Sequence, residues 1–331
     1  MSFFLSKIVF YKKNMSKKIL ANDGIDMQGK ALLEKAGFTV ITENVPQENL
    51  IKSINDCNYI GLTVRSATKV RKDVIDGCPD LKLIGRGGVG MDNIDVAYAR
   101  AKGLAVVNTP AASSHSVAEL VFAHLFNCVR FLYDSNRKMP VNGGIQFNDL
   151  KKKYAKGIEL KGKTIGIIGF GRIGQAVGKI ALGCGMKVIA FDPFLPEATI
   201  NIEIEGIKQK IEVKIITISL EKLLAESDFI SLHVPGGNVI TKKEFDLMKD
   251  GVCIVNASRG GVIDETDLIV ALNSGKVMHA ALDVFENEPS PKKELLEHPK
   301  ISLTPHIGAA TEEAQERIGI ELAELIISQI S

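Results

Sequence analysis

The chain has 331 residues, a length typical of two domains, and hydrophobic residues make up 45% of it, enough for a packed core. Its 41 Lys and Arg against 39 Asp and Glu leave a formal net charge of +2. This near balance argues against nucleic acid as a partner, because phosphate-binding surfaces carry a basic excess. A small anionic substrate, which needs only two or three local cations, is compatible with it.

The chain has no run of about 18 apolar residues, so we expect no transmembrane helix and no membrane partner. Residues 1–14 are apolar, but Lys7 interrupts them and no small-residue cleavage site follows. We interpret them as an extension or as a misplaced start ahead of Met15. Five cysteines without a Cys-x-x-Cys pair indicate buried thiols in a reducing cytoplasm and neither disulfides nor a metal site, so the predicted location is cytoplasmic.

Short runs rich in Ile, Val and Leu alternate with helical segments, and many are apolar on both faces, as buried parallel strands are. The predicted strands are Lys18–Ala21, Phe38–Ile41, Tyr59–Val64, Lys82–Arg86, Ala105–Asn108, Thr164–Ile168, Val188–Phe191, Phe229–His233, Val252–Asn256, Val277–Leu282 and Ile301–Thr304. Helical patterns at Asp26–Ala36 and Asn93–Lys102 are each followed by a glycine that suits the left-handed position after a helix. Repeated strand–helix units predict an α/β protein with doubly wound parallel sheets.

Other segments depart from this alternation of strands and helices. The apolar stretch Ser114–Tyr133 predicts one long helix, which we interpret as a buried connector between domains or as half of a subunit interface. The polar stretch Val141–Gly157 predicts a loop or linker. Within residues 199–216, apolar and polar residues alternate on both sides of Gly206, which predicts an inserted β-hairpin. A last helix is expected at Glu312–Ile330.

A glycine-rich loop follows the predicted strand Thr164–Ile168, with Gly169, Gly171 and Gly174 in the spacing G-x-G-x-x-G. These glycines allow a tight turn, a close approach of the backbone to a pyrophosphate, and close packing of the next helix. The N–H groups at that helix start offer a partial positive charge to phosphates. Asp192 ends the next strand, 18 residues after Gly174, and a carboxylate there accepts hydrogen bonds from ribose hydroxyls and repels a 2′-phosphate. The sequence therefore predicts NAD, in preference to NADP.

Three later strands lead into loops that carry Arg259, Glu288 and His306. In open α/β sheets ligands lie beyond the carboxyl ends of the strands, so these side chains can converge on the nicotinamide. Oxidation of a 2-hydroxy acid needs a base such as His306, a carboxylate that orients it, and an Arg that binds the substrate carboxylate. Each residue alone could be structural, but together they predict a dehydrogenase.

The segments NASRGGVIDE, ALDVFENEP and TPHIGAAT, with GFGRIG and VNTPAASSHSVAEL, closely resemble the D-isomer-specific 2-hydroxyacid dehydrogenase family, from about Lys17 to the C-terminus. The resemblance implies a Rossmann NAD-binding domain, residues 114–305, inserted into a flavodoxin-like substrate domain, residues 1–113 plus 306–331. It also implies a homodimer or homotetramer formed through the cofactor domains.

The resemblance assigns site residues as well. Arg259, Glu288 and His306 match the family's catalytic residues, and no metal ligand is implied. Cofactor contacts are implied at Gly169, Gly171, Arg172, Ile173, Gly174, Asp192, His233, Val234, Pro235, Ala257, Arg259, Asp283, His306 and Gly308. We interpret His233 as lining the cofactor cleft and not as a second base. Substrate contacts are implied at Arg65, Ser66, Gly88, Asn108, Arg130 and Arg259, with Arg130 reaching a neighbouring subunit's site.

Segments Val64–Val70 and Gly85–Asp95 look most like family members that oxidise D-3-phosphoglycerate to 3-phosphohydroxypyruvate, the first step of serine biosynthesis. Arg65 and Arg130 would bind the phosphate, although either could be structural. The alternatives are a glyoxylate or hydroxypyruvate reductase, or another D-2-hydroxyacid dehydrogenase, including one for a four-carbon phosphorylated acid.

Other proteins with the same fold give further alternatives. We expect none of the C-terminal regulatory domain that binds serine in many of these relatives, because the chain ends after the predicted last helix. NAD-sensing corepressors of this fold usually have long disordered tails, which we do not expect here. Formate dehydrogenases have an amide where this sequence has Glu288, so Glu288 argues against that activity.

Overall fold

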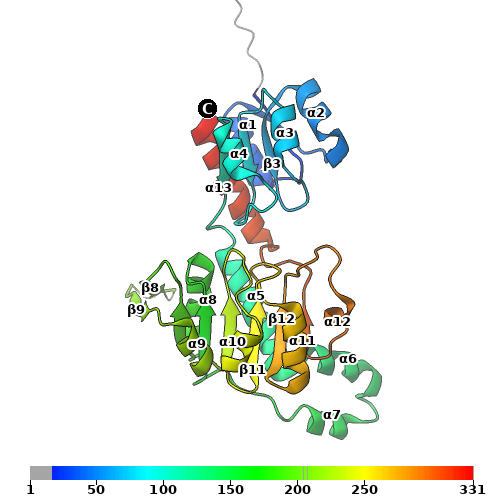
Figure 1. Cartoon of the computed structure of the whole chain (residues 1–331), viewed down its shortest axis with the longest axis vertical. Helices are drawn as coiled ribbons and strands as arrows, with labels where there is room; N and C mark the ends of the chain where they lie inside the picture. The colour runs from blue at the N-terminus through cyan, green and yellow to red at the C-terminus, as the bar shows by residue number, and fades with distance from the viewer. Residues whose placement is uncertain (1–16, 204, 207, 331) are drawn as a thin grey trace, which may run out of the picture. The chain divides into compact units, whose positions relative to one another are not determined.

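The computed structural model describes residues 17–203, 205–206 and 208–330, and the chain divides into two compact units (Figure 1). Unit 1 comprises Met1–Thr109 and Gln315–Ser331, and unit 2 comprises Pro110–Ala314. The boundaries expected from the sequence, at residues 113/114 and 305/306, lie four residues after the first of these and nine residues before the second. The interpretations of residues 1–14 and of a start at Met15 fall outside the described residues.

Unit 1 contains a five-stranded, all-parallel sheet in the order β2-β1-β3-β4-β5. Its strands are β1 (Lys17–Ala21), β2 (Phe38–Ile41), β3 (Tyr59–Val64), β4 (Leu83–Arg86) and β5 (Ala105–Asn108). Its helices are α1 (Met27–Lys35), the short 3-10 helix η1 (Gln47–Asn49), α2 (Leu50–Cys57), α3 (Lys72–Gly77), α4 (Val96–Ala101) and most of α13 (Glu312–Ile330). This is the flavodoxin-like strand order, so the predicted fold of this unit is confirmed.

Successive side chains of the strands pack on opposite faces of this sheet. Ile19 packs with Leu33 of α1 and Ile326 of α13, whereas its neighbour Leu20 belongs to a cluster that includes Val74 of α3. All are buried. Because both faces of the strands need cover, helices lie on both sides of the sheet.

Unit 2 contains a six-stranded parallel sheet in the order β13-β12-β11-β10-β6-β7, also covered on both faces. Its strands are β6 (Thr164–Ile168), β7 (Lys187–Phe191), β10 (Phe229–Leu232), β11 (Val252–Asn256), β12 (Val277–Leu282) and β13 (Ile301–Leu303). Its helices are α5 (Ser114–Arg130), α6 (Leu132–Asn142), α7 (Phe147–Lys153), α8 (Arg172–Gly183), α9 (Leu220–Glu226), α10 (Lys242–Leu247), α11 (Glu265–Ser274) and α12 (Lys293–Leu296). The predicted doubly wound Rossmann-like sheet is thus confirmed.

The predicted hairpin is also confirmed, as β8 (Glu197–Ile202) paired antiparallel with β9 (Ile211–Ile216). It follows β7, and among the described residues a single parallel bridge, Ala190 to Thr217, extends the main sheet beyond that strand. Ile200 and Ile215 are buried in the core that includes α8, which explains the period-two pattern.

The single helix predicted for residues 114–133 is wrong at its end. Phe131 has φ 55°, which ends α5 and begins α6. The Asn127 side chain, one turn earlier, accepts a hydrogen bond from the Tyr133 backbone N–H at 2.7 Å. That side-chain contact favours a break which hydrophobic periodicity does not predict.

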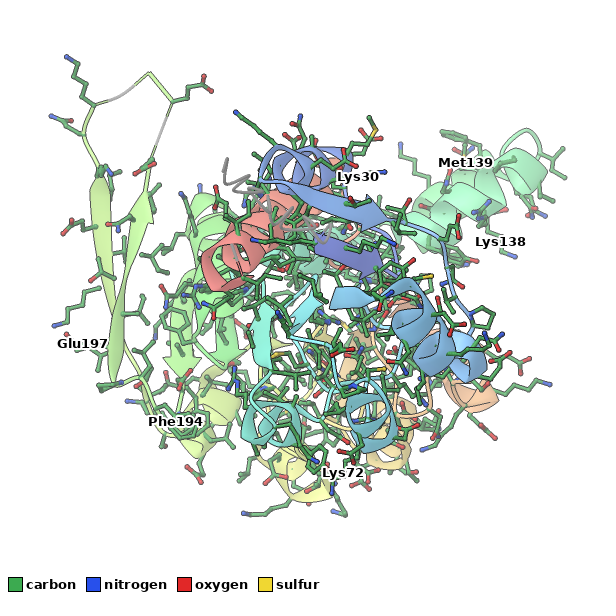
Figure 2. The ribbon with its side chains drawn as sticks, turned by 90° about the horizontal axis from the view of Figure 1, so that it is seen from above. Lys30, Lys72, Lys138, Met139, Phe194 and Glu197 are labelled. Atoms are coloured by element: carbon green, nitrogen blue, oxygen red, sulfur yellow. The ribbon has the colours of Figure 1, made fainter. Side chains whose placement is uncertain are left out.

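The loop predicted for residues 141–157 is wrong in part, because it contains α7. Leu150 is the buried residue of this short helix. Lys153 and Tyr154 both bind the Asp134 carboxylate on α6, at 2.6 and 2.7 Å. In both views α6 lies on the side of unit 2 away from the β8–β9 hairpin (Figures 1 and 2).

Among the described residues no single helix is long and apolar enough to cross a membrane. Helices α5 and α6 pass that test together but meet at 56°, and α5 buries one side in the core of unit 2. All five cysteines are free thiols. The cytoplasmic location stays a prediction.

Candidate functional site

The glycine loop joins β6 to α8 in unit 2. Gly169 has φ +87°, and a Cβ there would lie 2.5 Å from the His233 carbonyl oxygen, so only glycine fits. At Gly171 a Cβ would meet no atom within 4 Å, which leaves open space above the start of α8. No side chain caps that helix start, which Arg172 and Ile173 begin. The loop therefore fits a pyrophosphate bound by backbone N–H groups.

Asp192 follows β7 and faces this loop. Its Oδ2 accepts a hydrogen bond from the Phe170 N–H at 2.8 Å, and its Oδ1 accepts from the N–H groups of Phe194 and Leu195 at 2.9 and 3.2 Å. The carboxylate thus fixes both loops and keeps lone pairs that ribose hydroxyls could use. Phe194 is 93% exposed and projects outward near Glu197, at the start of the hairpin (Figure 2).

His233, Val234 and Pro235 follow β10, beside Gly169. The His233 Nε2 lies 2.8 Å from the Ser231 hydroxyl, and burial lowers the pKa of His233 to about 3. A ring with that pKa stays neutral near pH 7 and cannot exchange protons there as an acid or base. This agrees with a lining role in preference to a second base.

The loop after β11 presents Arg259. Asn256 is buried, and its Oδ1 accepts hydrogen bonds from the Ser258 N–H and hydroxyl, at 3.0 and 2.7 Å. Its Nδ2 donates to the Arg259 carbonyl at 2.8 Å, and Arg259 Nη1 donates to the Ser258 carbonyl at 2.6 Å. One buried amide therefore fixes the turn, and Ala257 is buried within it.

The loops after β11 and β12 lie against each other. A Cβ at Gly260 would lie 1.9 Å from the Phe285 carbonyl oxygen, so the contact exists only because residue 260 is glycine. The Phe285 N–H in turn donates to Glu288 Oε1 at 3.0 Å. The turn that carries Arg259 is thus next to the loop that carries Glu288.

His306 pairs with Glu288. Its Nδ1 lies 2.8 Å from Glu288 Oε2, and the side chains are 42% and 37% exposed. With Nδ1 donating to the carboxylate, Nε2 is left for a substrate oxygen. His306 has φ 56°, in the left-handed region, and the buried carboxylate of Asp283 accepts from the N–H groups of Ile307 and Gly308 at 2.8 and 2.9 Å. Asp283 therefore holds the His306 loop, and its expected contact with the cofactor stays a prediction.

The expected substrate residues of unit 1 gather at the carboxyl edge of its sheet. Arg65 and Ser66 follow β3, Gly88 follows β4, and Asn108 ends β5. The Asn108 side chain donates to the Val89 carbonyl at 2.7 Å, which ties two of these loops together. Arg65 is half-buried on a cavity of about 260 Å³, and Ser66 is exposed.

Arg130 is placed elsewhere. It ends α5, a helix of 17 residues and therefore about 25 Å long, whose first turn is tied to Gly308 through the Ser116 hydroxyl. Within unit 2 the helix length thus separates Arg130 from the His306 loop. A contact of Arg130 with a neighbouring subunit's site stays a prediction.

Sequence reasoning missed the residues that support these loops: Asn256, Gly260 and the loop-holding role of Asp283. The pair Gly260-Gly261 after a strand was one available signal of close backbone contact. The described part of the chain contains no cluster of His, Cys, Asp or Glu arranged to hold a metal ion.

Comparison with known proteins identifies the family. Residues 122–308 match the family model described as D-isomer specific 2-hydroxyacid dehydrogenase, NAD binding domain. The chain belongs to the D-isomer-specific 2-hydroxyacid dehydrogenases. This dehydrogenase is 43% identical over 321 residues to a hydroxypyruvate reductase of Thermotoga maritima, covering 95% of this chain and 98% of the relative. It is 41% identical over 313 residues to a D-3-phosphoglycerate dehydrogenase of Methanocaldococcus jannaschii, covering 93% of this chain but only 56% of that relative.

A solved relative shows the same fold with its ligands. The structure of D-lactate dehydrogenase from Aquifex aeolicus, complexed with NAD and lactic acid, matches 94% of this dehydrogenase and 94% of that chain, with a TM-score of 0.72 and 29% identity. The protein is an NAD-dependent oxidoreductase of D-2-hydroxy acids, and the glycine loop and Asp192 fit that cofactor.

Proposed function

We propose that this dehydrogenase interconverts D-3-phosphoglycerate and 3-phosphohydroxypyruvate, with His306 as the acid/base. NAD, when bound, accepts the hydride from C2 of the hydroxy acid. His306 Nε2 takes the hydroxyl proton as that hydride leaves, and returns it in the reverse direction. Glu288, 2.8 Å from Nδ1, stabilises the imidazolium that forms. The Arg259 guanidinium binds the substrate carboxylate through paired N–H groups.

Arg65 is the observation that supports a phosphorylated substrate. In a sheet of order 2-1-3-4-5, ligands bind beyond the carboxyl ends of the first and third strands. This is the switch point, from which the connections run toward opposite edges of the sheet. The cavity of about 260 Å³ lies there in unit 1, and Arg65 lines it. Among the described residues, no acidic side chain within 4 Å forms an ion pair with the Arg65 guanidinium. A phosphate could supply that partner.

Two aspartates also line this cavity, but their oxygens are already used. Asp23 accepts from the Arg65 backbone N–H at 2.7 Å and from the Thr68 hydroxyl at 2.6 Å. Asp26 caps α1 by accepting from the Gln28 N–H at 2.8 Å. Both carboxylates therefore shape the loops, and Arg65 is the group available to an anion.

A second candidate function is reduction of hydroxypyruvate, which lacks the phosphate. The similarity to the Thermotoga maritima hydroxypyruvate reductase over 98% of that protein's length favours it. Glyoxylate is a smaller acid of the same class. In each case Arg65 would have no phosphate to bind.

The test is oxidation of NADH by the purified full chain with 3-phosphohydroxypyruvate, hydroxypyruvate, glyoxylate and 2-oxoglutarate. We expect kcat/KM to be highest for the phosphorylated acid. Arg65→Ala should raise its KM by about 10- to 100-fold, the worth of a charge-assisted hydrogen-bond pair, and change the KM of hydroxypyruvate by less than about twofold. Arg71→Ala, which breaks an exposed ion pair with Asp95, is the matched control. Equal or better rates with hydroxypyruvate or glyoxylate would establish the second candidate instead.

We also infer a homodimer formed through α5, α6 and α7 of unit 2. Large apolar side chains are 41–83% exposed along this surface, and such patches mark interfaces. They are Phe126, Leu132, Tyr133, Met139, Val141, Ile145 and Phe147. Figure 2 shows Met139 on α6, on the side of unit 2 away from the β8–β9 hairpin. Light scattering should give the dimer mass for the wild type and for Val270→Glu on α11, and the monomer mass for Ile145→Glu; a monomeric wild type would contradict the inference.

A further inference from the structure

The buried side of α5 carries an imidazole among apolar residues. His124 is 3% exposed. Its Nδ1 lies 2.8 Å from the Ser302 hydroxyl and its Nε2 lies 2.9 Å from the Thr304 hydroxyl. Ser302 is in β13 and Thr304 follows it, so both belong to the segment that leads into the His306 loop. A buried imidazole is costly unless both nitrogens are hydrogen-bonded, and here both are.

With His124 neutral, the chemistry of the groups fixes the direction of each hydrogen bond in the network of Asn127, Ser302, His124, Thr304 and Asp283. The Asp283 carboxylate can only accept, so the Thr304 hydroxyl donates to it, at 2.6 Å. Because that hydroxyl has one proton, its oxygen accepts from His124 Nε2. Nδ1 of the neutral ring then accepts from the Ser302 hydroxyl, whose oxygen accepts from Asn127 Nδ2 at 2.7 Å. In this network no two donors and no two acceptors face each other.

This arrangement requires His124 to be neutral. A protonated ring would donate from both nitrogens, and the Ser302 hydroxyl would lose its acceptor. Burial lowers the pKa of His124, against the opposite effect of the nearby Asp283 charge. The electrostatic surroundings therefore agree with the donor pattern.

Asp283 is the member of this hydrogen-bond network that contacts the His306 loop. It is 1% exposed, and its oxygens also accept from the backbone N–H groups of Ile307 and Gly308. These two residues follow His306, which has a φ of 56°. Residues other than glycine rarely adopt such a positive φ. Such a conformation persists only where its surroundings determine it.

We propose that His124 is a positioning residue for the acid/base His306. It orients the Thr304 hydroxyl, which orients the Asp283 carboxylate, which holds the loop in which His306 faces Glu288. The proposal rests on the proposed catalytic role of His306. Without His124, the carboxylate can rotate away from the two N–H groups, and the left-handed turn at His306 loses its support. A displacement of about 1 Å at a reacting group is enough to slow a reaction by about 100-fold.

The test compares two substitutions at His124 with whichever keto acid the enzyme turns over fastest. His124→Leu removes both hydrogen bonds, whereas the amide of His124→Gln can donate to Thr304 and accept from Ser302. We expect His124→Leu to lower kcat about 10- to 100-fold, with the KM values of NADH and keto acid within about threefold of the wild type. The deuterium isotope effect with deuterated NADH should rise, because the chemical step becomes limiting. His124→Gln should recover kcat to within about threefold.

Active sites are counted by titration of NADH fluorescence, so that loss of folded protein does not appear as loss of rate. Cys128→Ala removes volume from the same buried side of α5 and leaves the hydrogen-bond chain intact, so it reports the effect of packing alone. If folded His124→Leu binds NADH stoichiometrically with kcat within twofold of the wild type, the proposal is wrong. If it does not fold, Ser302→Ala decides: a kcat lower by about threefold or more supports the proposal, and an unchanged kcat overturns it.

His306→Gln is assayed in parallel. Near-wild-type activity of that variant would refute the proposed role of His306 itself. An inactive His306→Gln together with fully active His124 variants would refute only the positioning role.

Discussion

The neutral state of His233 predicts how stability depends on pH. Burial lowers the pKa of this histidine to about 3, whereas in an unfolded chain it titrates near 6.5. Its Nε2 bonds the Ser231 hydroxyl, and its buried Nδ1 has no hydrogen-bond partner among the described residues. Below about pH 6.5 the unfolded chain therefore binds a proton that the folded protein does not, so the free energy of unfolding rises with pH in this range.

The size of the effect follows from that one proton. The stability contribution is fully present above about pH 6.5 and falls by up to about 1.4 kcal/mol per pH unit below it. Between pH 7 and pH 5 the loss from His233 alone comes to about 2 kcal/mol, a large share of a typical total of about 5–15 kcal/mol. His124 and His279, whose pKa values burial also lowers, add to the loss in the same direction.

The assay uses His233→Asn, which keeps a polar side chain but cannot titrate. Hydrogen exchange of the β10 amides, corrected for intrinsic rates, gives the local free energy of opening at pH 7 and pH 5. The loss between the two pH values should be about 2 kcal/mol smaller in the variant than in the wild type. His115→Asn, at an exposed position, is the control and should leave the wild-type loss intact. An equal loss in wild type and His233→Asn would show that burial does not keep this ring neutral. The pH profile of kcat should keep its midpoints, since His233 moves no proton in catalysis.

Two more predictions concern the loops of unit 2. Asp192→Asn removes a charge that repels a 2′-phosphate, so the ratio of kcat/KM for NADH to that for NADPH should fall by about 10-fold; an unchanged ratio would show that Asp192 does not select the cofactor. Gly260→Ala places a Cβ 1.9 Å from the Phe285 carbonyl oxygen and should lower kcat at least about 10-fold by separating the Arg259 and Glu288 loops. Gly183→Ala, where a Cβ would meet no atom within 4 Å, should have wild-type kcat, and wild-type activity in both variants would refute the reasoning.

The strands were predictable because each is a short apolar run between residues that end it. β2, β3, β5, β6, β11 and β12 have the predicted bounds. The carboxyl-edge rule then placed Arg259, Glu288 and His306 near one another without any knowledge of side-chain geometry, since parallel strands end at the same edge. Strands form where apolar residues run together between residues that end a strand, and both features can be read directly from the sequence.

The errors lie where one side chain decides the backbone. Hydrophobic periodicity runs unbroken through Phe131, yet Asn127 bonds the Tyr133 N–H and the helix breaks. The Lys-rich stretch of α7 reads as a solvated loop, yet Asp134 binds Lys153 and Tyr154 across the turn. Each of these contacts joins two residues whose pairing cannot be read from composition or periodicity.

The same reason explains why the support of the catalytic loop could not be predicted. Asp283 stands in the sequence as a carboxylate at a strand end, which pattern alone interprets as a ligand contact. Whether it also holds the backbone depends on whether N–H groups 24 and 25 residues away reach it, and they do. His124 is more remote still, because its partners lie about 180 residues along the chain. A polar residue on the apolar side of a predicted helix therefore indicates that it has a hydrogen-bond partner. Which residue that partner is can be learned only from the three-dimensional structure.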